Sequence, residues 1–305
     1  MLALTVLSIR AQEGPRVAEK PTPAGISKAP AKIESRWLAK KRTHVTQLTH
    51  KGPSPQEGEP LDSPPRGSKT VIYESGHLKL KAWYQPISDG RKHPTLVYLH
   101  GGFALGEDDL TILDAFHQAG FVIMTPALRG ENGNPGIHEL YCGELDDALA
   151  AIAWVKKQNE VDPARIVTFG HSAGGVLSAL LSLYPDAAVL TGSCGGLYDV
   201  GVFEYRECPF DPKNRDESAI RVLPPNVAEM KTRHVAYVGK QDGLVMEGAK
   251  AAAEGAKAAG HKLLQIQLLE GDHFETLEPA LKLFLAESQK AVSGLKAPPA
   301  NPADR

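Results

Sequence analysis

The chain of 305 residues is 42% hydrophobic and has 34 basic and 36 acidic residues, which gives a formal net charge of −2. This near balance excludes the electrostatic footprint of a nucleic-acid-binding protein and a polybasic membrane patch. No apolar run reaches the roughly 20 residues of a membrane-spanning helix, so we expect no membrane span.

The first 68 residues are expected to lie outside the catalytic body. Residues 1–12 resemble the remnant of a secretory signal peptide, because an apolar stretch precedes a small residue before a cleavage point. This favours a secreted or periplasmic protein; the alternative is a simple apolar N-terminus and a cytoplasmic location. Residues 13–68 are rich in proline and are expected to form a disordered linker, with a short helix as an option at 33–41. Residues 294–305 repeat this composition and are expected to form a disordered tail.

Strand and helix signals alternate between residues 69 and 293. This alternation predicts an α/β protein with a mostly parallel eight-stranded sheet flanked by helices, in a single catalytic domain. Ligands of such sheets bind beyond the carboxyl ends of the strands. The expected strands are 70–73, 78–84, 95–99, 121–125, 165–170, 187–191, 235–238 and 263–269; the expected helices are 108–119, 140–158, 173–183, 247–259 and 275–291.

A serine lies in the turn after the expected strand 165–170. The sequence from Gly170 to Gly174 fits the G-x-S-x-G pattern, in which a strained strand-to-helix turn exposes the hydroxyl of the central residue, Ser172. The alternative is an ordinary turn with the serine as a helix N-cap. His171 is adjacent, but neighbouring side chains diverge in a tight turn. We therefore interpret His171 as a structural or pocket-lining residue rather than the catalytic base.

The expected strand 95–99 is followed by the sequence His-Gly-Gly-Phe at 100–103. Such a turn supplies backbone N–H groups to a tetrahedral oxyanion, and its glycines let the backbone approach the substrate. The expected donors are the N–H of Phe103 or Gly102 and the N–H of Ala173. His100 is expected to fix this loop by hydrogen bonding.

Two later turns supply the expected acid and base. Asp242 follows the strand 235–238, and His273 follows the last strand. This chain order, serine then acid then histidine, is the order of the α/β-hydrolase triad. His273 would take the Ser172 proton and later protonate the leaving group, while Asp242 would hold the imidazole tautomer. Asp272 is a competitor for the role of acid, but it is adjacent to His273 in the chain.

Further residues are candidates for the substrate pocket. Arg129 could clamp a substrate carboxylate, although pairing with Glu139 or Glu144 is the default interpretation. Residues 197–226 are expected to form a small lid over the pocket, with Tyr198 and Tyr205 as lining residues; the alternative is a self-packed loop.

We expect no cofactor and no metal. Glu144, Asp146 and Asp147 lie in the first turns of an expected helix, where acidic residues favour the helix dipole. No histidine lies at ligand spacing from them. Cys194 and Cys208 are the favoured pair if a disulfide forms; otherwise the three cysteines are buried or idle thiols.

The chain resembles the α/β-hydrolase superfamily. More narrowly, it looks like prolyl oligopeptidase-like serine hydrolases and dienelactone-hydrolase-like esterases. Prolyl oligopeptidases carry a β-propeller, which does not fit in the 68 residues before the expected catalytic body. Dienelactone hydrolases use a cysteine nucleophile, whereas the expected nucleophile here is Ser172. The resemblance implies a carboxylic ester hydrolase that works through an acyl-enzyme; a peptidase acting on short peptides and a non-catalytic binding protein are the alternatives. The sequences that carry it are HGGF at 100–103, PALRGENGNPG at 126–136, GHSAGG at 170–175, VGKQDGLV at 238–245 and GDHF at 271–274.

Overall fold

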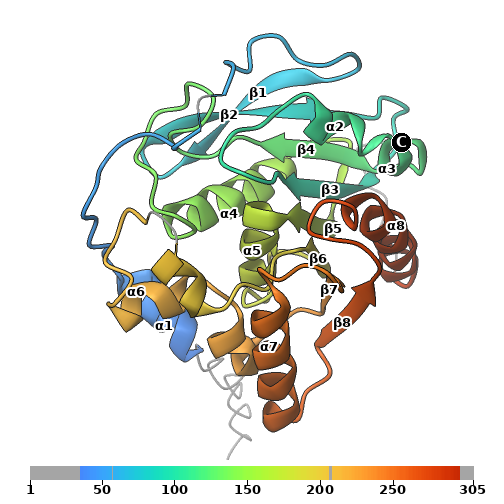
Figure 1. Ribbon diagram of the computed structural model, residues 1–305. Coiled ribbons are helices and arrows are strands. Elements are labelled where there is room, and N and C mark those ends of the chain that lie inside the picture. The colour runs from blue at the N-terminus through green and yellow to red at the C-terminus, as the bar shows by residue number, and fades with distance from the viewer. Residues whose placement is uncertain (1–34, 57, 206–207, 296–305) are drawn as a thin grey trace, which may run out of the picture. The chain divides into compact units, whose positions relative to one another are not determined.

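The computed structural model describes residues 35–56, 58–205 and 208–295 (Figure 1). Eight strands form one sheet, as the sequence predicts, and their order in the sheet is β1-β2-β4-β3-β5-β6-β7-β8. The described residues from Ser35 onward form a compact unit. The strands are β1 (Lys69–Ser75), β2 (Leu78–Gln85), β3 (His93–Leu99), β4 (Val122–Pro126), β5 (Val161–His171), β6 (Leu190–Cys194), β7 (His234–Gly239) and β8 (Leu264–Leu269).

The sheet is antiparallel at one edge and parallel elsewhere. β1 pairs with β2, and β2 with β4, in antiparallel registers, while β4, β3, β5, β6, β7 and β8 are parallel neighbours. Every residue of β4, β6 and β7 is buried, which is typical of parallel strands covered on both faces. The prediction of a mostly parallel α/β sheet is confirmed, and the arrangement is that of the α/β-hydrolase fold.

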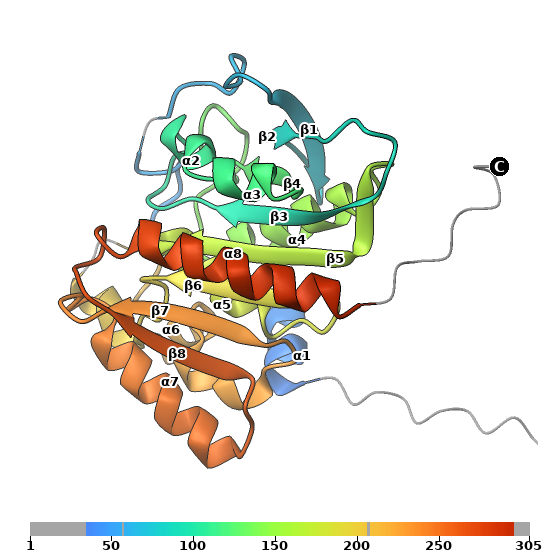
Figure 2. The same ribbon diagram turned by 90° about the vertical axis from the view of Figure 1, so that its right-hand side faces the viewer.

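Helices cover both faces of this sheet (Figure 2). Buried side chains of α4, α5 and α7 share one apolar cluster, and those of α3 and α8 share a second cluster on the other face. The helices are α1 (Arg36–Thr43), α2 (Asp108–Thr111), α3 (Asp114–Gln118), α4 (Gly143–Val155), α5 (Ser172–Leu181), α6 (Arg215–Ile220), α7 (Met246–Ala259) and α8 (Leu277–Ser293), with 3-10 turns η1 (Val200–Tyr205) and η2 (Pro224–Glu229).

Several elements differ in their bounds from the sequence prediction; strand β5, for example, begins at Val161 rather than at residue 165. The expected helix 108–119 is two short helices, α2 and α3. The expected helix 140–158 begins only at Gly143, because Leu140 and Tyr141 have positive φ angles of 50° and 71°, which no α-helix accommodates. The sixth strand is shifted by three residues toward the C-terminus, to β6.

The prediction that residues 13–68 are a linker is wrong for the described residues from Ser35 onward. Helix α1 buries Trp37 to 3% exposure, and Leu61 is fully buried. Residues 44–56, which we call the N-terminal arm, follow α1. The Ser54 hydroxyl of the arm bonds the carbonyl oxygen of Phe103 in the turn at 100–103, which we call the oxyanion turn after its expected role. The arm has few apolar side chains, but its backbone groups pair with other parts of the protein. The remnant expected at 1–12 lies outside the described residues, as do residues 13–34 and 296–305.

Among the described residues, no helix combines the length and apolarity needed to cross a membrane. Within the same ranges, no group of three or more histidine, cysteine, aspartate or glutamate side chains is placed to hold a metal ion.

Candidate active site

The expected site residues follow strands that end at the same edge of the sheet. The last residue of β5, His171, pairs with Cys194 at the end of β6, and Cys194 pairs with Tyr237 near the end of β7. Strand β8 continues this edge, with Leu269 opposite Gly239. The turns that contain the serine, the acid and the histidine therefore lie next to one another, although 101 positions separate Ser172 from His273.

The serine turn has the backbone strain expected of a nucleophile elbow. Ser172 has φ +52°, a left-handed conformation that costs a non-glycine residue about 1 kcal/mol or more. A Cβ atom at Gly170 would lie 2.1 Å from the Gly174 carbonyl oxygen, and one at Gly174 would lie 2.0 Å from the Leu99 carbonyl oxygen. Both positions therefore require glycine. Strain that surrounding backbone enforces in this way is typical of functional sites.

The oxyanion turn lies directly against the serine turn. The backbone N–H of Gly174 donates to the carbonyl oxygen of His100 at 3.0 Å. Gly102 has φ +65°, so its turn uses the freedom of glycine. Ala173 is at the beginning of α5, where backbone N–H groups have no partner within the helix. The structure thus brings together all three expected backbone donors, those of Gly102, Phe103 and Ala173.

A buried ion pair holds His100 in the oxyanion turn. Its Nε2–H donates to Oε2 of Glu131 at 3.0 Å, and its Nδ1 lies 3.1 Å from the Gly101 carbonyl oxygen. Both side chains are 2% exposed. Burial alone lowers the pKa of His100, but the Glu131 carboxylate outweighs it and raises that pKa to about 9. A charged imidazolium fits this site, because each ring nitrogen faces an oxygen acceptor.

The expected acid and base are paired. His273 Nδ1–H donates to Asp242 Oδ2 at 2.7 Å, and the two residues are 8% and 2% exposed. Asp242 Oδ1 in turn accepts the backbone N–H of Leu244 at 3.1 Å, which fixes the carboxylate. This bond to Nδ1 leaves Nε2 of His273 as the ring nitrogen that can accept a proton.

His171 connects the serine turn to the histidine turn. Its Nε2–H donates to the His273 carbonyl oxygen at 2.9 Å, and the two imidazole rings have centroids 5.1 Å apart. Burial lowers the pKa of His171, in keeping with a neutral ring. Gly195, with φ +64°, lies on the other side of the pair: a Cβ there would be 2.6 Å from His273 Cε1. His171 is thus placed as a structural support, as the sequence interpretation holds.

Ser172 has a hydrogen-bond partner that the sequence did not predict. Its Oγ lies 3.0 Å from the hydroxyl of Tyr198, which is 1% exposed. Tyr198 therefore reaches the nucleophile itself rather than only lining a pocket. Among hydrogen bonds between described residues, none joins Ser172 to His273. For the expected proton transfer to Nε2 of His273, the serine hydroxyl would have to rotate away from Tyr198.

Arg129 does not extend freely into the site. Its guanidinium makes a two-pronged contact with Asp147, at 2.8 and 2.9 Å, and a third bond with Glu139 at 3.0 Å. These carboxylates occupy the guanidinium fork, which supports pairing rather than substrate binding; the second partner is Asp147, not Glu144. The side chain of Tyr205 lies outside the described part of the structure.

The three cysteines are buried and form no disulfide, so the disulfide option between Cys194 and Cys208 is not realised. Cys194 Sγ lies 3.4 Å from the hydroxyl of Thr276, and burial raises the pKa of Cys194 to about 11. A thiol with this pKa is protonated at neutral pH and is a poor nucleophile.

Several residues that shape the site were not predicted from the sequence. Glu131 accepts from His100 and from the backbone N–H of Leu128. Asn132, with φ +50°, bonds the backbone N–H and carbonyl of Leu105. The available signal was the cluster of asparagine and glycine at 130–136, which is typical of a structured loop with left-handed residues.

A family model and one curated relative match part of this chain. The BD-FAE family model matches residues 82–205. An uncharacterized protein of Mycobacterium tuberculosis is 31% identical over 160 residues, which are 52% of this chain and 56% of that protein. The aligned region is therefore about half the length of each chain.

Two solved structures are similar in fold at low sequence identity. One is a Pyrococcus furiosus esterase, with a TM-score of 0.62 and 14% identity over 83% of this chain and all of that chain. The other is a puromycin-hydrolyzing peptidase of Mycobacterium tuberculosis, with a TM-score of 0.62 and 19% identity over 73% of this chain and 40% of that chain. Both similarities support the expected fold, which is the α/β-hydrolase fold.

Proposed function

We propose that this protein is a serine hydrolase that cleaves carboxylic esters through an acyl-enzyme. One observation carries the proposal: Ser172 has a left-handed φ of +52° in a turn that is attached, through His171, to the buried pair of His273 and Asp242. A strained serine next to a carboxylate-oriented imidazole is the arrangement that activates a hydroxyl as a nucleophile.

In the proposed reaction, the Ser172 hydroxyl attacks the ester carbonyl while Nε2 of His273 takes its proton. Backbone N–H groups of Ala173 and of Phe103 or Gly102 stabilise the tetrahedral oxyanion. Collapse of this intermediate expels the alcohol, which receives the proton from His273. Water then attacks the acyl group on Ser172 while His273 takes its proton; the acyl–oxygen bond breaks, His273 returns the proton to the Ser172 oxygen, and the carboxylic acid leaves.

The substitution Ser172→Ala tests this proposal. We expect the rate of p-nitrophenyl butyrate hydrolysis to fall by about 10⁴-fold or more, with the far-UV circular dichroism spectrum unchanged. The wild-type protein should also be labelled at Ser172 by a fluorophosphonate, and the variant should not. A variant that retained full activity would refute the mechanism, and an unreactive wild-type serine would favour a binding protein.

A peptidase that acts on short peptides is the second candidate. The similarity in fold to the puromycin-hydrolyzing peptidase favours it, whereas the similarity to the Pyrococcus esterase favours an ester substrate. The ratio of kcat/KM values for p-nitrophenyl butyrate and an aminoacyl p-nitroanilide separates the two. We expect the ester to be the better substrate; a higher value for the anilide would identify a peptidase.

A further inference from the structure

A glutamine side chain lies where the proposed mechanism needs the substrate carbonyl. The backbone N–H of Phe103, one of the expected oxyanion donors, donates to Oε1 of Gln56 at 2.5 Å. A Cβ atom at Gly102 would lie 2.6 Å from the same oxygen. The carboxamide of Gln56 therefore covers both residues of the turn, and its carbonyl is chemically equivalent to that of an amide substrate.

The N-terminal arm, which carries Gln56, is bonded to the oxyanion turn and to the segment that contains Gly130 and His138. The Ser54 hydroxyl donates to the carbonyl oxygen of Phe103, and the Ser54 backbone N–H donates to that of Gly130 at 3.0 Å. The His138 backbone N–H donates to the carbonyl oxygen of Gly52 at 2.9 Å. These bonds place Gln56 over the turn without any contribution from its own side chain.

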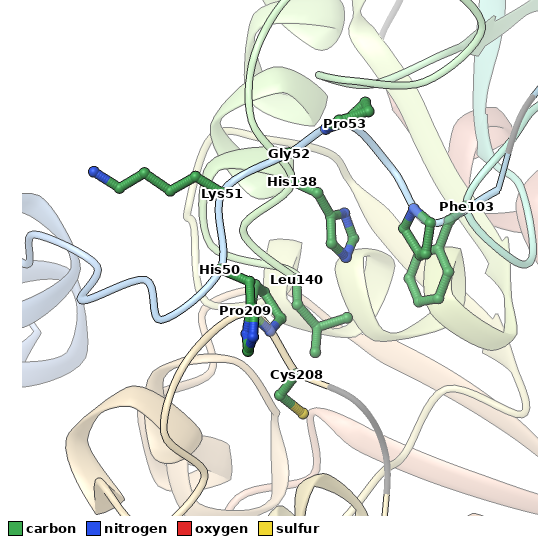
Figure 3. A pocket seen from close by; sticks show the side chains of 10 residues that line it. His50, Lys51, Gly52, Pro53, Phe103, His138, Leu140, Cys208 and Pro209 are labelled. Carbon is green, nitrogen blue, oxygen red and sulfur yellow. The ribbon is translucent and has the colours of Figure 1, made fainter.

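The arm is also bonded to the predicted lid. Leu48 forms an isolated β-bridge with Phe210, and the Thr49 backbone N–H donates to the Pro209 carbonyl oxygen at 2.7 Å. The arm thus extends from the lid to the oxyanion turn. It is one wall of a cavity of about 240 Å³ whose other walls include Phe103, His138 and Leu140 (Figure 3).

We propose that Gln56 is a residue of the substrate site whose carboxamide competes with the substrate carbonyl for the N–H of Phe103. The inference rests on the proposed function. The substrate binds only after the Gln56 side chain has moved aside. The apparent affinity for substrate is therefore reduced by the fraction of molecules in which Gln56 has left the turn. Gln56 is exposed to solvent, so its side chain can leave the turn while the rest of the arm stays in place.

The kinetic consequence is specific. An internal competitor raises KM and leaves kcat unchanged, because saturating substrate displaces it. A neutral hydrogen bond of this kind corresponds to about a 2- to 10-fold shift of an equilibrium. Gln56→Ala should therefore lower KM for p-nitrophenyl butyrate by about 2- to 10-fold at constant kcat.

A matched control and a substitution with the opposite expected effect on KM sharpen the test. Gln47 is an exposed glutamine of the same arm whose backbone N–H, not its side chain, bonds Glu217, so Gln47→Ala should leave KM and kcat unchanged. Gln56→Glu places a carboxylate on the Phe103 N–H; because an ionised acceptor bonds more strongly, KM should rise above the wild-type value.

The same variants distinguish failure of the inference from failure of the proposed function. If Gln56→Ala leaves KM unchanged, raises it, or lowers kcat, then Gln56 supports the loop and does not compete with substrate. Fluorophosphonate labelling of Ser172 in the wild-type protein shows that the proposed function stands in that case. A wild-type protein that neither hydrolyses esters nor reacts with the fluorophosphonate would remove both proposals.

Discussion

The two turns of the site are stabilised in different ways. The serine turn is fixed by its own backbone: glycines at 170 and 174 allow contacts that any side chain would prevent. The oxyanion turn is held by side chains from distant segments, with Glu131 bound to His100 and Ser54 bound to Phe103. The first turn is therefore rigid for steric reasons, whereas the second depends on charge, protonation and the position of the N-terminal arm.

This contrast gives the two turns different sensitivities to mutation and pH. The serine turn should respond to added volume and to backbone strain. The oxyanion turn should respond to the charge state of His100. The acid–base pair, which neither turn contains, should respond to the loss of its carboxylate. Five predictions test these differences, from the largest expected effect to the smallest.

The largest effect is expected for Asp242→Asn. An asparagine can retain the position of the carboxylate but favours the wrong imidazole tautomer and does not stabilise the imidazolium, so kcat should fall by about 10³- to 10⁴-fold. Steady-state kinetics with p-nitrophenyl butyrate measures this loss. Asp272→Asn is the matched control, because that exposed carboxylate accepts backbone N–H groups of Phe274 and Glu275 and, among the described residues, makes no side-chain hydrogen bond to His273. If kcat fell as much in Asp272→Asn as in Asp242→Asn, the assignment of Asp242 as the acid would be wrong.

Gly174→Ala should be the most destabilising substitution at the serine turn. The new Cβ would lie 2.0 Å from the Leu99 carbonyl oxygen, a backbone atom that cannot rotate away. We expect the free energy of unfolding to fall by about 3 kcal/mol or more, measured by urea denaturation. Gly52→Ala, where the Cβ meets nothing within 4 Å, should change it by less than about 1 kcal/mol. Equal losses in the two variants would contradict the steric argument.

The oxyanion turn should lose stability as the pH rises. The pKa of His100 is about 9 in the folded protein, against about 6.5 in an unfolded chain. Between these values the folded state binds more protons, so the stabilisation is complete below pH 6.5 and is lost as the pH rises through about 9. The total is at most about 3 kcal/mol, from 1.36 kcal/mol for each pKa unit. Urea denaturation at pH 6.5, 7.5 and 9 measures the slope.

Glu131→Gln tests whether this slope belongs to the His100–Glu131 pair. The amide oxygen of glutamine can still accept the N–H of Leu128 but no longer carries the charge that keeps His100 protonated. The variant should be less stable than the wild type at pH 6.5 and should approach it at pH 9. If the two proteins keep the same pH dependence, other groups are responsible.

The smallest effect is expected at Ser172 itself. Glycine adopts φ +52° without steric cost, whereas alanine pays the penalty of a left-handed conformation. Ser172→Gly should therefore be about 1 kcal/mol more stable than Ser172→Ala, although both are inactive. Thermal unfolding of the two variants measures the difference. If alanine were the more stable of the two, the turn would not be strained.

Most of the scaffold could be predicted because its signals are local. Alternating apolar strands and helices indicated eight strands in a mostly parallel sheet, and a serine, an aspartate and a histidine each follow one of these strands. Since parallel strands end at one edge, their turns had to be neighbours. The boundaries of α4 and β6 were missed because positive φ angles at Leu140 and Tyr141 and the exact register of a strand have no strong signal in a single sequence.

The contacts of the N-terminal arm and the ion pair at the oxyanion turn could not be predicted from the sequence. Proline-rich composition predicted a linker at 13–68, but the arm at 44–56 is held by backbone hydrogen bonds to partners more than 70 positions away, such as Gly130 and His138. Composition measures how much apolar surface a segment can bury. It does not measure how many backbone groups find partners elsewhere.

The sequence by itself determined the strand-and-helix order, the glycines that a strained serine turn requires, and the chain order of Ser172, Asp242 and His273. These follow from periodicity and backbone sterics, which act over a few residues. Only the tertiary structure decided that Tyr198 holds the serine hydroxyl, that Glu131 charges His100, and that Gln56 covers the Phe103 N–H. Each of these contacts joins segments far apart in the chain, and a side chain's partner across such a distance depends on the whole fold.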